Sequence, residues 1–366
     1  MPIKLKVTKE AIIDGLQRVQ NVVSTRTTLP ILSNVLVQAS ANSVRLTTTD
    51  LDVAVRCQVE AEVSKEGSTT LPARKLFSIL KEVPAAEIEI EVDDRNAASI
   101  RCGSSFYKIM GLPEEEFPRF PEAGAGKALK LEQSVLRDML QKTAYAVSND
   151  ETRYVLNGVF MGLKADKLTV VATDGRRLAL IEHDIEVPKG SEAELILPTK
   201  AVGELARLLT DKGDAKLSIG ENQIVFELDG TTLASKLIEG TYPNFRQVIP
   251  TETKERIPLE RELLLAALHR ASILASEKSQ SVKLNFAKNT LTITATTPEV
   301  GEAKETLSIN YKGKEITIAF NPQYMMDPLR NLDADEVFIE LTDELSPGVI
   351  KVNAPFLYVL MPMRLS

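Results

Sequence analysis

The 366-residue sequence contains no tryptophan and only two histidines and two cysteines, and these shortages exclude several kinds of chemistry. A zinc site or a Ser-His-Asp triad would have to be built around His183 or His269, and no Cys/His pair has metal-ligand spacing. Cys57 and Cys102 lie in strand-like stretches without a CxxC partner, so we expect reduced thiols and no disulfide. A histidine-based zinc site or catalytic triad is therefore disfavoured.

Long apolar runs are also missing. Runs such as residues 263–267 are far shorter than the roughly 20 residues that cross a bilayer, and the opening MPIK is not typical of a signal peptide. We expect a cytoplasmic protein. The net charge of −7 disfavours a protein that wraps nucleic acid by bulk charge, although cations can gather on one face. The letters GAGK at 124–127 lack the first glycine of a phosphate-binding loop and follow no strand, which indicates a linker.

Three parts of the chain present the same signals in the same order, with a period of about 125 residues. Each has a helix-like stretch, strand-like runs, and a second helix that opens at a proline, whose missing N–H costs nothing there. The recurring landmarks are the serines that close the first helix (Ser24, Ser148, Ser276), the ends of a strand run (Asp50, Asp174, Thr297) and the prolines (Pro72, Pro198, Pro322). The chain is therefore predicted to be a threefold repeat.

Each repeat is predicted to be an α+β layer, with a helix, about three strands, a second helix and about four strands. The alternation EIEIEV at 87–92 is typical of an antiparallel strand with one solvated face. Linkers at 113–127 and 250–256 divide the chain into predicted domains 1–124, 125–250 and 251–366. The predicted helices are 9–24, 73–82, 132–148, 199–212, 260–276 and 322–331. These windows hold 13 Lys and Arg against 10 Asp and Glu, an excess that ordinary solvated helices also explain.

Helix counting limits what such a chain could surround. At about 10 Å between packed axes, six helices close a ring with a hole near 9 Å, which is too narrow for duplex DNA. Twelve helices, from two copies, would leave roughly 28 Å, enough for a duplex about 20 Å wide. If the chain encircles DNA, two copies are needed.

Four stretches carry a resemblance to a known family: LPILSN at 29–34, TDGRRLA at 173–179, SKLIEG at 235–240 with YPNF at 242–245, and YVLMPMRL at 358–365. Through them the whole chain resembles the bacterial DNA sliding clamps, the β subunits of DNA polymerase III. The resemblance implies three repeated domains of the DNA-clamp fold, with helices lining a central hole, antiparallel sheets outside, and a ring closed by a head-to-tail homodimer.

The resemblance also implies a function. Members of this family are non-catalytic processivity factors that encircle double-stranded DNA independently of its sequence. The resemblance therefore implies no catalytic residue, no metal site and no cofactor. They tether partners that carry short linear motifs: the polymerase III catalytic subunit, the clamp loader, other polymerases and repair proteins. A terminal apolar strand with methionines suits such ligands, because methionine adapts to varied shapes and peptides can anchor Leu and Phe side chains there.

The resemblance places three sets of site residues on this sequence. The homodimer contact would involve Lys75, Phe106, Tyr107, Ile109, Ile273 and Leu274. The partner-peptide pocket, between the second and third domains, would involve Leu156, Thr173, Gly175, Arg176, Arg177, Leu178, Pro243, Val248, Tyr324, Val359, Leu360, Met361, Pro362, Met363 and Arg364. The DNA-facing residues would be Arg26, Arg74, Arg153, Tyr154, Lys200 and Arg207. Few phosphate contacts suit a protein that must slide without gripping one register.

The resemblance does not specify which ion pairs contribute to the dimer contact. Ser104 and Phe106 stand near positions where members of the family often have arginine. Lys75 or Lys108 would then face Glu299, Glu302 or Glu305 across the contact.

From the residues alone, plainer interpretations stay open. The apolar dimer residues could belong to the core of their own domain, Asp174-Gly175 could be an ordinary hairpin turn, and residues 361–363 could be an edge strand. Two other functions also remain. One is a metal-dependent hydrolase with Asp50, Asp52 and Asp174 as oxygen ligands, although the third repeat has Thr297 at the equivalent position. The other is a non-enzymatic scaffold that does not encircle DNA.

Overall fold

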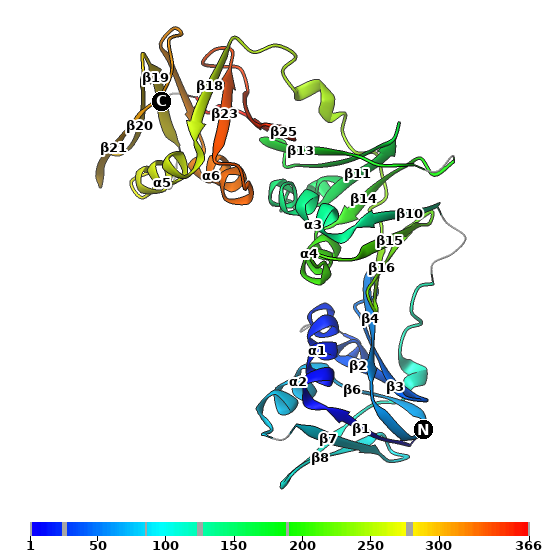
Figure 1. The fold of residues 1–366 in the computed structure, drawn as a ribbon. Coiled ribbons are helices and arrows are strands. Elements are labelled where there is room, and N and C mark those ends of the chain that lie inside the picture. The colour runs from blue at the N-terminus through cyan, green and yellow to red at the C-terminus, as the bar shows by residue number, and fades with distance from the viewer. Residues whose placement is uncertain are drawn as a thin grey trace. The chain divides into compact units, whose positions relative to one another are not determined.

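The computed structural model describes residues 2–23, 28–84, 86–122, 127–187, 190–275 and 281–364 (Figure 1). Within these residues the chain forms six α-helices and 25 β-strands. It separates into two compact units. The first contains residues 1–137, 188–191 and 200–237, and the second contains residues 138–187, 192–199 and 238–366.

Three repeats of one element order account for all of these strands and α-helices. The first repeat comprises β1 (Ile3–Thr8), α1 (Lys9–Val19), β2 (Asn34–Ser40), β3 (Ser43–Thr49), β4 (Val53–Glu60), β5 (Glu62–Lys65), β6 (Gly67–Pro72), α2 (Ala73–Glu82), β7 (Glu87–Val92), β8 (Ala97–Cys102) and β9 (Ser105–Met110). The second comprises β10 (Lys127–Glu132), α3 (Gln133–Gln141), β11 (Gly158–Lys164), β12 (Lys167–Thr173), β13 (Arg177–Asp184), β14 (Ala193–Pro198), α4 (Thr199–Leu208), β15 (Asp214–Ile219), β16 (Gln223–Leu228) and β17 (Thr231–Lys236). The third comprises β18 (Glu255–Glu260), α5 (Arg261–Ser272), β19 (Val282–Ala287), β20 (Thr290–Thr297), β21 (Gly301–Ser308), β22 (Ile316–Phe320), α6 (Pro322–Asn331), β23 (Glu336–Leu341), β24 (Gly348–Val352) and β25 (Ala354–Leu360).

The repeat differs in two details from its sequence prediction. Four strands separate the two helices of the second and third repeats, and five separate those of the first, where we expected about three. Several helices are also shorter than predicted, because α1 and α3 each give way to a short 3-10 turn. After α3 the hydroxyl of Thr143 donates to the carbonyl of Met139 at 2.8 Å, a side-chain bond that competes with the helical ladder.

Two antiparallel sheets lie in each compact unit. In the first unit they are β5-β1-β7-β8-β9 and β10-β15-β16-β17-β4-β3-β2-β6. In the second unit they are β14-β11-β12-β13-β25-β24-β23-β18 and β21-β20-β19-β22. Each eight-stranded sheet is therefore shared by two consecutive repeats. Strand β9 ends a sheet of the first unit, and strand β21 ends a sheet of the second.

The repeats join through equivalent strands. The last strand of the second repeat, β17, pairs with β4 of the first over five residues of each strand, from Val53 to Cys57 on β4. The last strand of the third repeat, β25, pairs with β13 of the second over five residues, from Arg177 to Ile181 on β13. In each junction the first five residues of the earlier strand, β4 or β13, are paired, so the two junctions have the same register.

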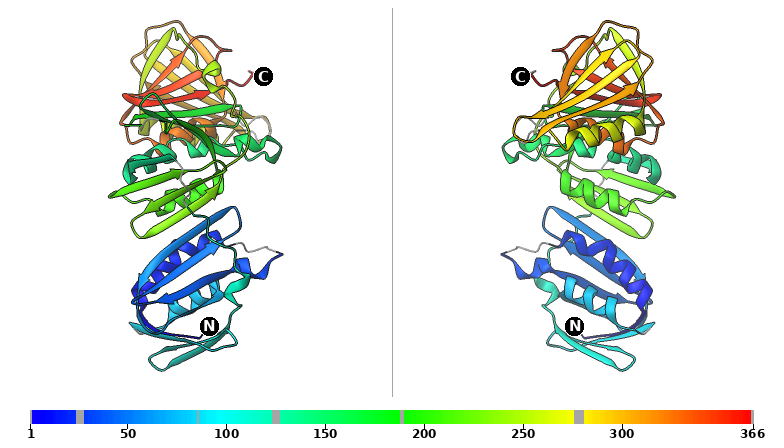
Figure 2. Two further views of the ribbon diagram at one scale, coloured as in Figure 1. Left: turned by 90° about the vertical axis from the view of Figure 1, so that its right-hand side faces the viewer. Right: turned by 90° about the vertical axis from the view of Figure 1, so that its left-hand side faces the viewer.

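The two helices of the first repeat pack side by side on one face of its strands, as α1 and α2 do in Figure 1 and in the right-hand view of Figure 2, and α5 packs against α6 in the third repeat. Helix α1 buries Ile12, Gly15, Leu16 and Val19, the spacing of one helical face. A side chain at Gly15 would collide with Val59 of β4, because its Cβ would lie 2.4 Å from a methyl carbon there. The glycine therefore permits the close approach of helix and sheet. In the described residues no helix is long and apolar enough to span a membrane.

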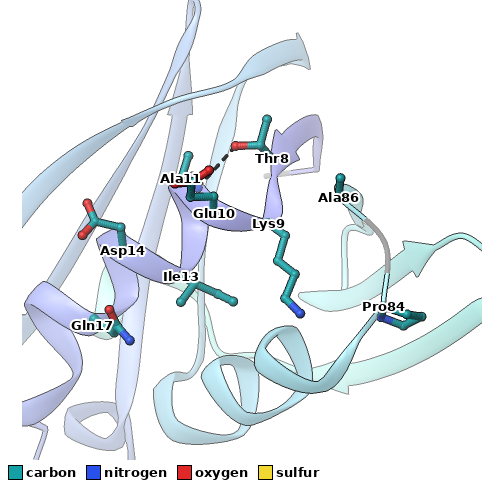
Figure 3. A pocket seen from close by; sticks show the side chains of 9 residues that line it. All are labelled: Thr8, Lys9, Glu10, Ala11, Ile13, Asp14, Gln17, Pro84 and Ala86. Atoms are coloured by element: carbon teal, nitrogen blue, oxygen red, sulfur yellow. Dashed lines mark hydrogen bonds between the residues drawn. The ribbon is translucent and has the colours of Figure 1, made fainter.

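In every repeat one backbone hydrogen bond joins the start of the first helix to the segment that follows the second helix. The backbone N–H of the first residue of the first helix donates to a carbonyl just beyond the second helix: Lys9 to Ala86 at 2.7 Å, Gln133 to Gly213 at 3.0 Å, and Arg261 to Asp335 at 2.8 Å. In the first repeat the Nζ of Lys9 also donates to the carbonyls of Lys81 and Val83, at 2.8 and 2.6 Å. Figure 3 shows this lysine reaching from α1 toward the end of α2, across a hollow bordered by Pro84 and Ala86. A cation at a helix C-terminus stabilises the helix dipole.

Candidate functional site

The predicted peptide-pocket residues lie around the line where β13 pairs with β25. Leu178 lies opposite Val359, and Arg177 lies opposite Leu360. The buried members Leu156, Leu178 and Val359 pack in one apolar cluster. Other residues of that cluster, none of them predicted, include Phe160, Val171, Leu180, Ile196 and Tyr242, with Phe245 packed against it.

Other predicted pocket residues lie at the surface. Val248 is 49% exposed and Met361 is 44% exposed, which is high for large apolar side chains. The remaining exposed members are Gly175, Arg176, Pro243 and Arg364. Thr173 and Leu360 are buried, and Tyr324, Pro362 and Met363 are half-buried. The predicted set therefore combines a buried apolar floor with an exposed apolar and basic surface.

Side chains shape the turn between β12 and β13. The Oδ1 atom of Asp174 accepts hydrogen bonds from the backbone N–H of Arg176 at 2.8 Å and of Arg177 at 3.0 Å. The hydroxyl of Thr173 donates to the carbonyl of Arg177 at 2.6 Å and accepts from the N–H of Gly175 at 3.1 Å. Gly175 has φ +85°, where a side chain would be strained. The turn presents Gly175 and Arg176 to solvent in one defined conformation.

Arg177 is not an exposed pocket residue, because only 10% of its side chain is exposed. Its Nε donates to Asp174 at 3.1 Å, its Nη1 to Asp327 of α6 at 2.5 Å, and its Nη2 to the carbonyl of Tyr145 at 2.6 Å. The guanidinium also lies 4.3 Å from the ring centroid of Tyr324. Burial alone would lower the pKa of Arg177, but the surrounding groups, among them Tyr358, Asp327 and Asp174, raise it above its usual value.

Two tyrosines missed by the sequence analysis complete this arginine's surroundings. The hydroxyl of Tyr358 donates to the carbonyl of Tyr324 at 2.8 Å, which ties β25 to α6. The rings of Tyr145 and Tyr358 lie 6.0 Å apart. The Tyr145 hydroxyl is buried and has no hydrogen-bond partner within the described ranges, and burial raises its pKa well above the usual value. Tyr358 opens the stretch 358–365 that carries the family resemblance, but nothing in the sequence links it or Tyr145 to Arg177, because these contacts join segments far apart in the chain.

The segment after β25 is held on both sides. The N–H of Met361 donates to the carbonyl of Arg176 at 3.0 Å, and the N–H of Met363 donates to the carbonyl of Ala319 on β22 at 2.7 Å. Backbone hydrogen bonds therefore fix the segment beyond the end of β25, although the structure assigns it no strand of its own, and the Met361 side chain stays exposed.

Two cations predicted to face DNA have partners inside the first unit. Arg207 of α4 donates to the carbonyls of Gln17 and Arg18 on α1, each at 2.8 Å. Lys200 forms an ion pair with Asp50 and donates to the carbonyl of Val22 at 3.3 Å. Both therefore bind the second repeat to the first, a role that the sequence analysis did not anticipate. Their orientation toward DNA stays a prediction.

The other DNA-facing candidates differ in their exposure and in the contacts that their side chains make. Arg74 is exposed, and its side chain has no partner among the described residues. Tyr154 is 60% exposed. Arg153 donates to the carbonyl of Asp174 at 3.2 Å and lies 3.6 Å from the carboxylate of Asp150. Arg26 lies outside the described residues.

Three of the predicted dimer residues, Phe106, Tyr107 and Ile109, lie on the edge strand β9, whereas Lys75 lies on α2 and Ile273 and Leu274 follow α5. On β9, Phe106 is 57% exposed and Tyr107 is 36% exposed, while Ile109 is half-buried. Ile273, which follows α5, is 71% exposed, so it is not a core residue of its own unit. Leu274 is half-buried, and Lys75 is exposed. Glu305 of β21 already pairs with Arg270 of α5 at 2.6 Å.

The carboxylates of the hydrolase interpretation serve local structure. Asp50 Oδ1 accepts from the N–H of Asp52 at 3.0 Å and of Val53 at 2.7 Å, just as Asp174 does at the equivalent turn of the second repeat. Asp52 pairs with Lys236 at 3.1 Å. Over the described ranges no group of three or more His, Cys, Asp or Glu is placed to hold a metal ion.

Comparison with solved structures identifies the class of protein. The chain superposes on a sliding clamp from Pseudomonas aeruginosa bound to griselimycin with a TM-score of 0.95, at 34% identity and over 100% of both chains. A clamp from Bacillus subtilis gives a TM-score of 0.95 at 29% identity, again over 100% of both chains. The three-repeat fold is therefore that of a DNA sliding clamp.

Sequence comparison identifies the family. Models of the N-terminal, central and C-terminal domains of the DNA polymerase III beta subunit match residues 3–121, 130–244 and 246–364. The beta sliding clamp of Chlamydia pneumoniae is 35% identical over 362 residues, 99% of each protein. That of Pseudomonas putida is 36% identical over 364 residues, 98% of this chain and 99% of the relative. The chain belongs to the DNA polymerase III beta subunit family and has the function of a DNA sliding clamp in replication.

Proposed function

We propose that this clamp encircles duplex DNA as a head-to-tail homodimer in which β9 of one copy pairs with β21 of the other. The supporting observation is the repeat itself. Strands β4, β13 and β21 are equivalent, and so are β9, β17 and β25. Two of the three equivalent junctions form within the chain, β4 with β17 and β13 with β25. Strands β21 and β9 are left over, and pairing them between two copies removes two exposed edges.

The internal junctions also define the register of this contact. Ile109, Ser235 and Leu360 are equivalent, because they lie opposite Ala98, Ile224 and Gly348 in their own hairpins. Ala54, Leu178 and Glu302 are equivalent, because they lie opposite Thr49, Thr173 and Thr296. Within the chain, Val53 pairs with Ser235 and the equivalent Arg177 pairs with Leu360. The equivalent pair between two copies is therefore Gly301 with Ile109. Glu302 then faces Lys108, an opposite-charge pair typically worth about 0.2–1 kcal/mol.

Cysteine crosslinking tests this register. The double variant Lys108→Cys and Glu302→Cys is expected to form a covalent dimer under mild oxidation, because directly paired Cα atoms fall within disulfide reach. The control variant Lys108→Cys and Thr306→Cys moves one thiol four residues along β21, and it is expected to stay monomeric on denaturing gels. The two native thiols, Cys57 and Cys102, are both buried, and burial raises the pKa of the Cys57 thiol to about 12, so background crosslinking is expected to be slow. Equal crosslinking of both variants would contradict the register, and a monomer in light scattering at tens of micromolar would contradict the dimer.

We further propose that partner proteins bind by a short linear motif at the surface formed by Val248, Met361 and the β12–β13 turn. The support is that both apolar side chains are exposed and that each lies next to residues of the buried apolar floor in the sequence, Val248 before Ile249 and Met361 two residues after Val359. Fluorescence anisotropy with a fluorescein-labelled peptide, Gln-Leu-Ser-Leu-Phe, tests the site. Val248→Asp and Met361→Asp are each expected to weaken binding at least tenfold, the scale of a binding hot spot. Leu345→Asp is the matched control, because Leu345 is an 83% exposed leucine in the same unit. Equal loss in all three variants would place the site elsewhere.

The chain is proposed to have no catalytic activity of its own. Opening of the ring and loading would then be driven by a separate ATPase, and Arg74, Arg153 and Tyr154 would face the DNA. Purified clamp is expected to release no phosphate from ATP and to cut no DNA with magnesium or manganese present. Metal-dependent cleavage abolished by Asp174→Asn would revive the hydrolase interpretation.

A further inference from the structure

We propose that Asp327 of α6, acting through Arg177, is a positioning residue for partner peptides. It would hold the turn of residues 173–177 in the conformation that receives them. This inference rests on the proposed peptide site. Asp327 itself would not touch the peptide, since its side chain is only 16% exposed and faces the guanidinium of Arg177.

The argument follows a chain of contacts from α6 to the turn. Asp327 accepts from Nη1 of Arg177, and the Nε of the same guanidinium donates to Oδ2 of Asp174. The other oxygen of Asp174 accepts from the N–H groups of Arg176 and Arg177. The carboxylate that shapes the exposed turn is therefore held by an arginine that α6 holds in place.

The same helix also secures the other side of the proposed site. Tyr324, one turn before Asp327 on α6, covers the face of the Arg177 guanidinium at 4.3 Å. Its carbonyl accepts from the hydroxyl of Tyr358 on β25, the strand that leads into Met361. Loss of the Asp327 carboxylate would thus affect both the turn of residues 173–177 and the segment that follows β25.

Burial explains why the contact matters. Arg177 and Asp327 are 10% and 16% exposed, and removing one partner of a buried ion pair is costly. Without the Asp327 carboxylate, Arg177 would be left with the carboxylate of Asp174. Arg177 would then redistribute its hydrogen bonds, and Asp174 would be less firmly held. The turn would sample more conformations, so the peptide would have to order it on binding.

The test combines binding and exchange on the full-length clamp. Asp327→Asn is expected to weaken binding of the fluorescein-labelled peptide Gln-Leu-Ser-Leu-Phe roughly tenfold. Hydrogen exchange of the Arg176 and Arg177 amides is expected to accelerate even without peptide. Asp327→Glu keeps the carboxylate and is expected to restore most of both properties.

The matched control is Glu340→Gln. Glu340 is a carboxylate of the same unit, 6% exposed, paired with Lys351 at 2.8 Å. Its replacement is expected to lower stability but to leave peptide affinity and turn exchange within twofold of the parent protein. Equal effects of Asp327→Asn and Glu340→Gln would reduce Asp327 to a stabilising role, and parental affinity in Asp327→Asn would overturn the proposal. If the parent clamp bound no peptide, the proposed site would fail, while the exchange comparison would still test the hold of Asp327 on the turn.

Discussion

Arg207 on α4 donates from Nη1 to the carbonyl oxygen of Gln17 on α1 at 2.8 Å, and these residues are 190 positions apart in the chain. The accepting carbonyl is one of the last four of α1, which have no partner within the helix. A cation on the second repeat therefore completes a helix of the first. This use of charge differs from the DNA contact that the family resemblance implies for the same residue.

The first prediction separates structural from DNA-facing cations. Arg207→Ala is expected to lower the free energy of unfolding by about 1–3 kcal/mol, because it removes charged hydrogen bonds to the end of α1. Arg74→Ala is the control, because the Arg74 side chain has no partner in the part of the chain that the structure describes. It should leave the urea midpoint unchanged and slow loading onto nicked circular DNA. Equal stability of the two variants would contradict the structural role of Arg207.

The second prediction concerns the exposed residues after α5. Ile273→Glu and Leu274→Glu together place carboxylates in the proposed dimer contact, where burying unpaired charge is unfavourable. The expected product is a folded monomer of 40.3 kDa in light scattering, with parental far-ultraviolet circular dichroism. Because Ile273 is 71% exposed in the single chain, its substitution should not disturb the core. An unfolded double variant would place these residues in the core instead.

The third prediction addresses retention on DNA. An encircling clamp should stay on a nicked circle through about 0.5 M salt, where counterion competition removes proteins held by phosphate contacts. Linearising the same circle should release it. Gel filtration of a labelled clamp after loading measures both dwell times, and equal retention on circular and linear DNA would contradict encirclement.

The fourth prediction is a pH dependence at the end of α5. The hydrogen bond from Arg270 holds the pKa of Glu305 below its usual value. A lowered folded-state pKa adds stability above the unfolded pKa of about 4.3, and that stability is lost as the pH falls through the folded value. The urea midpoint of Glu305→Gln should therefore decline less than that of the parent protein between pH 6 and pH 3. The control is Glu299→Gln, which removes an exposed carboxylate that has no ion-pair partner in the described part of the chain. A Glu305→Gln midpoint that declined as steeply as that of the parent protein would refute the linkage.

The sequence predicted the repeat better than its internal detail. Prolines and strand ends recur in all three repeats, and the alternation at residues 87–92 became β7, as expected. The extra strand between the helices was missed because β6 and β14 run directly into their helices at Pro72 and Pro198. A proline that opens a helix can also close a strand, and local sequence does not separate the two.

The threefold pattern, the family and the positions of the residues that resemble its sites could all be predicted from the amino-acid sequence. Periodicity and turn residues act over a few positions, so they can be read along the chain. Which charged side chains already have partners could be learned only from the folded chain. Arg177 meets Asp327, and Lys200 meets Asp50, each across 150 residues of chain. A cation that binds a phosphate and one that completes a distant helix or turn look alike in sequence. Their difference lies in the neighbour that folding brings to them, and burial then makes that neighbour costly to remove.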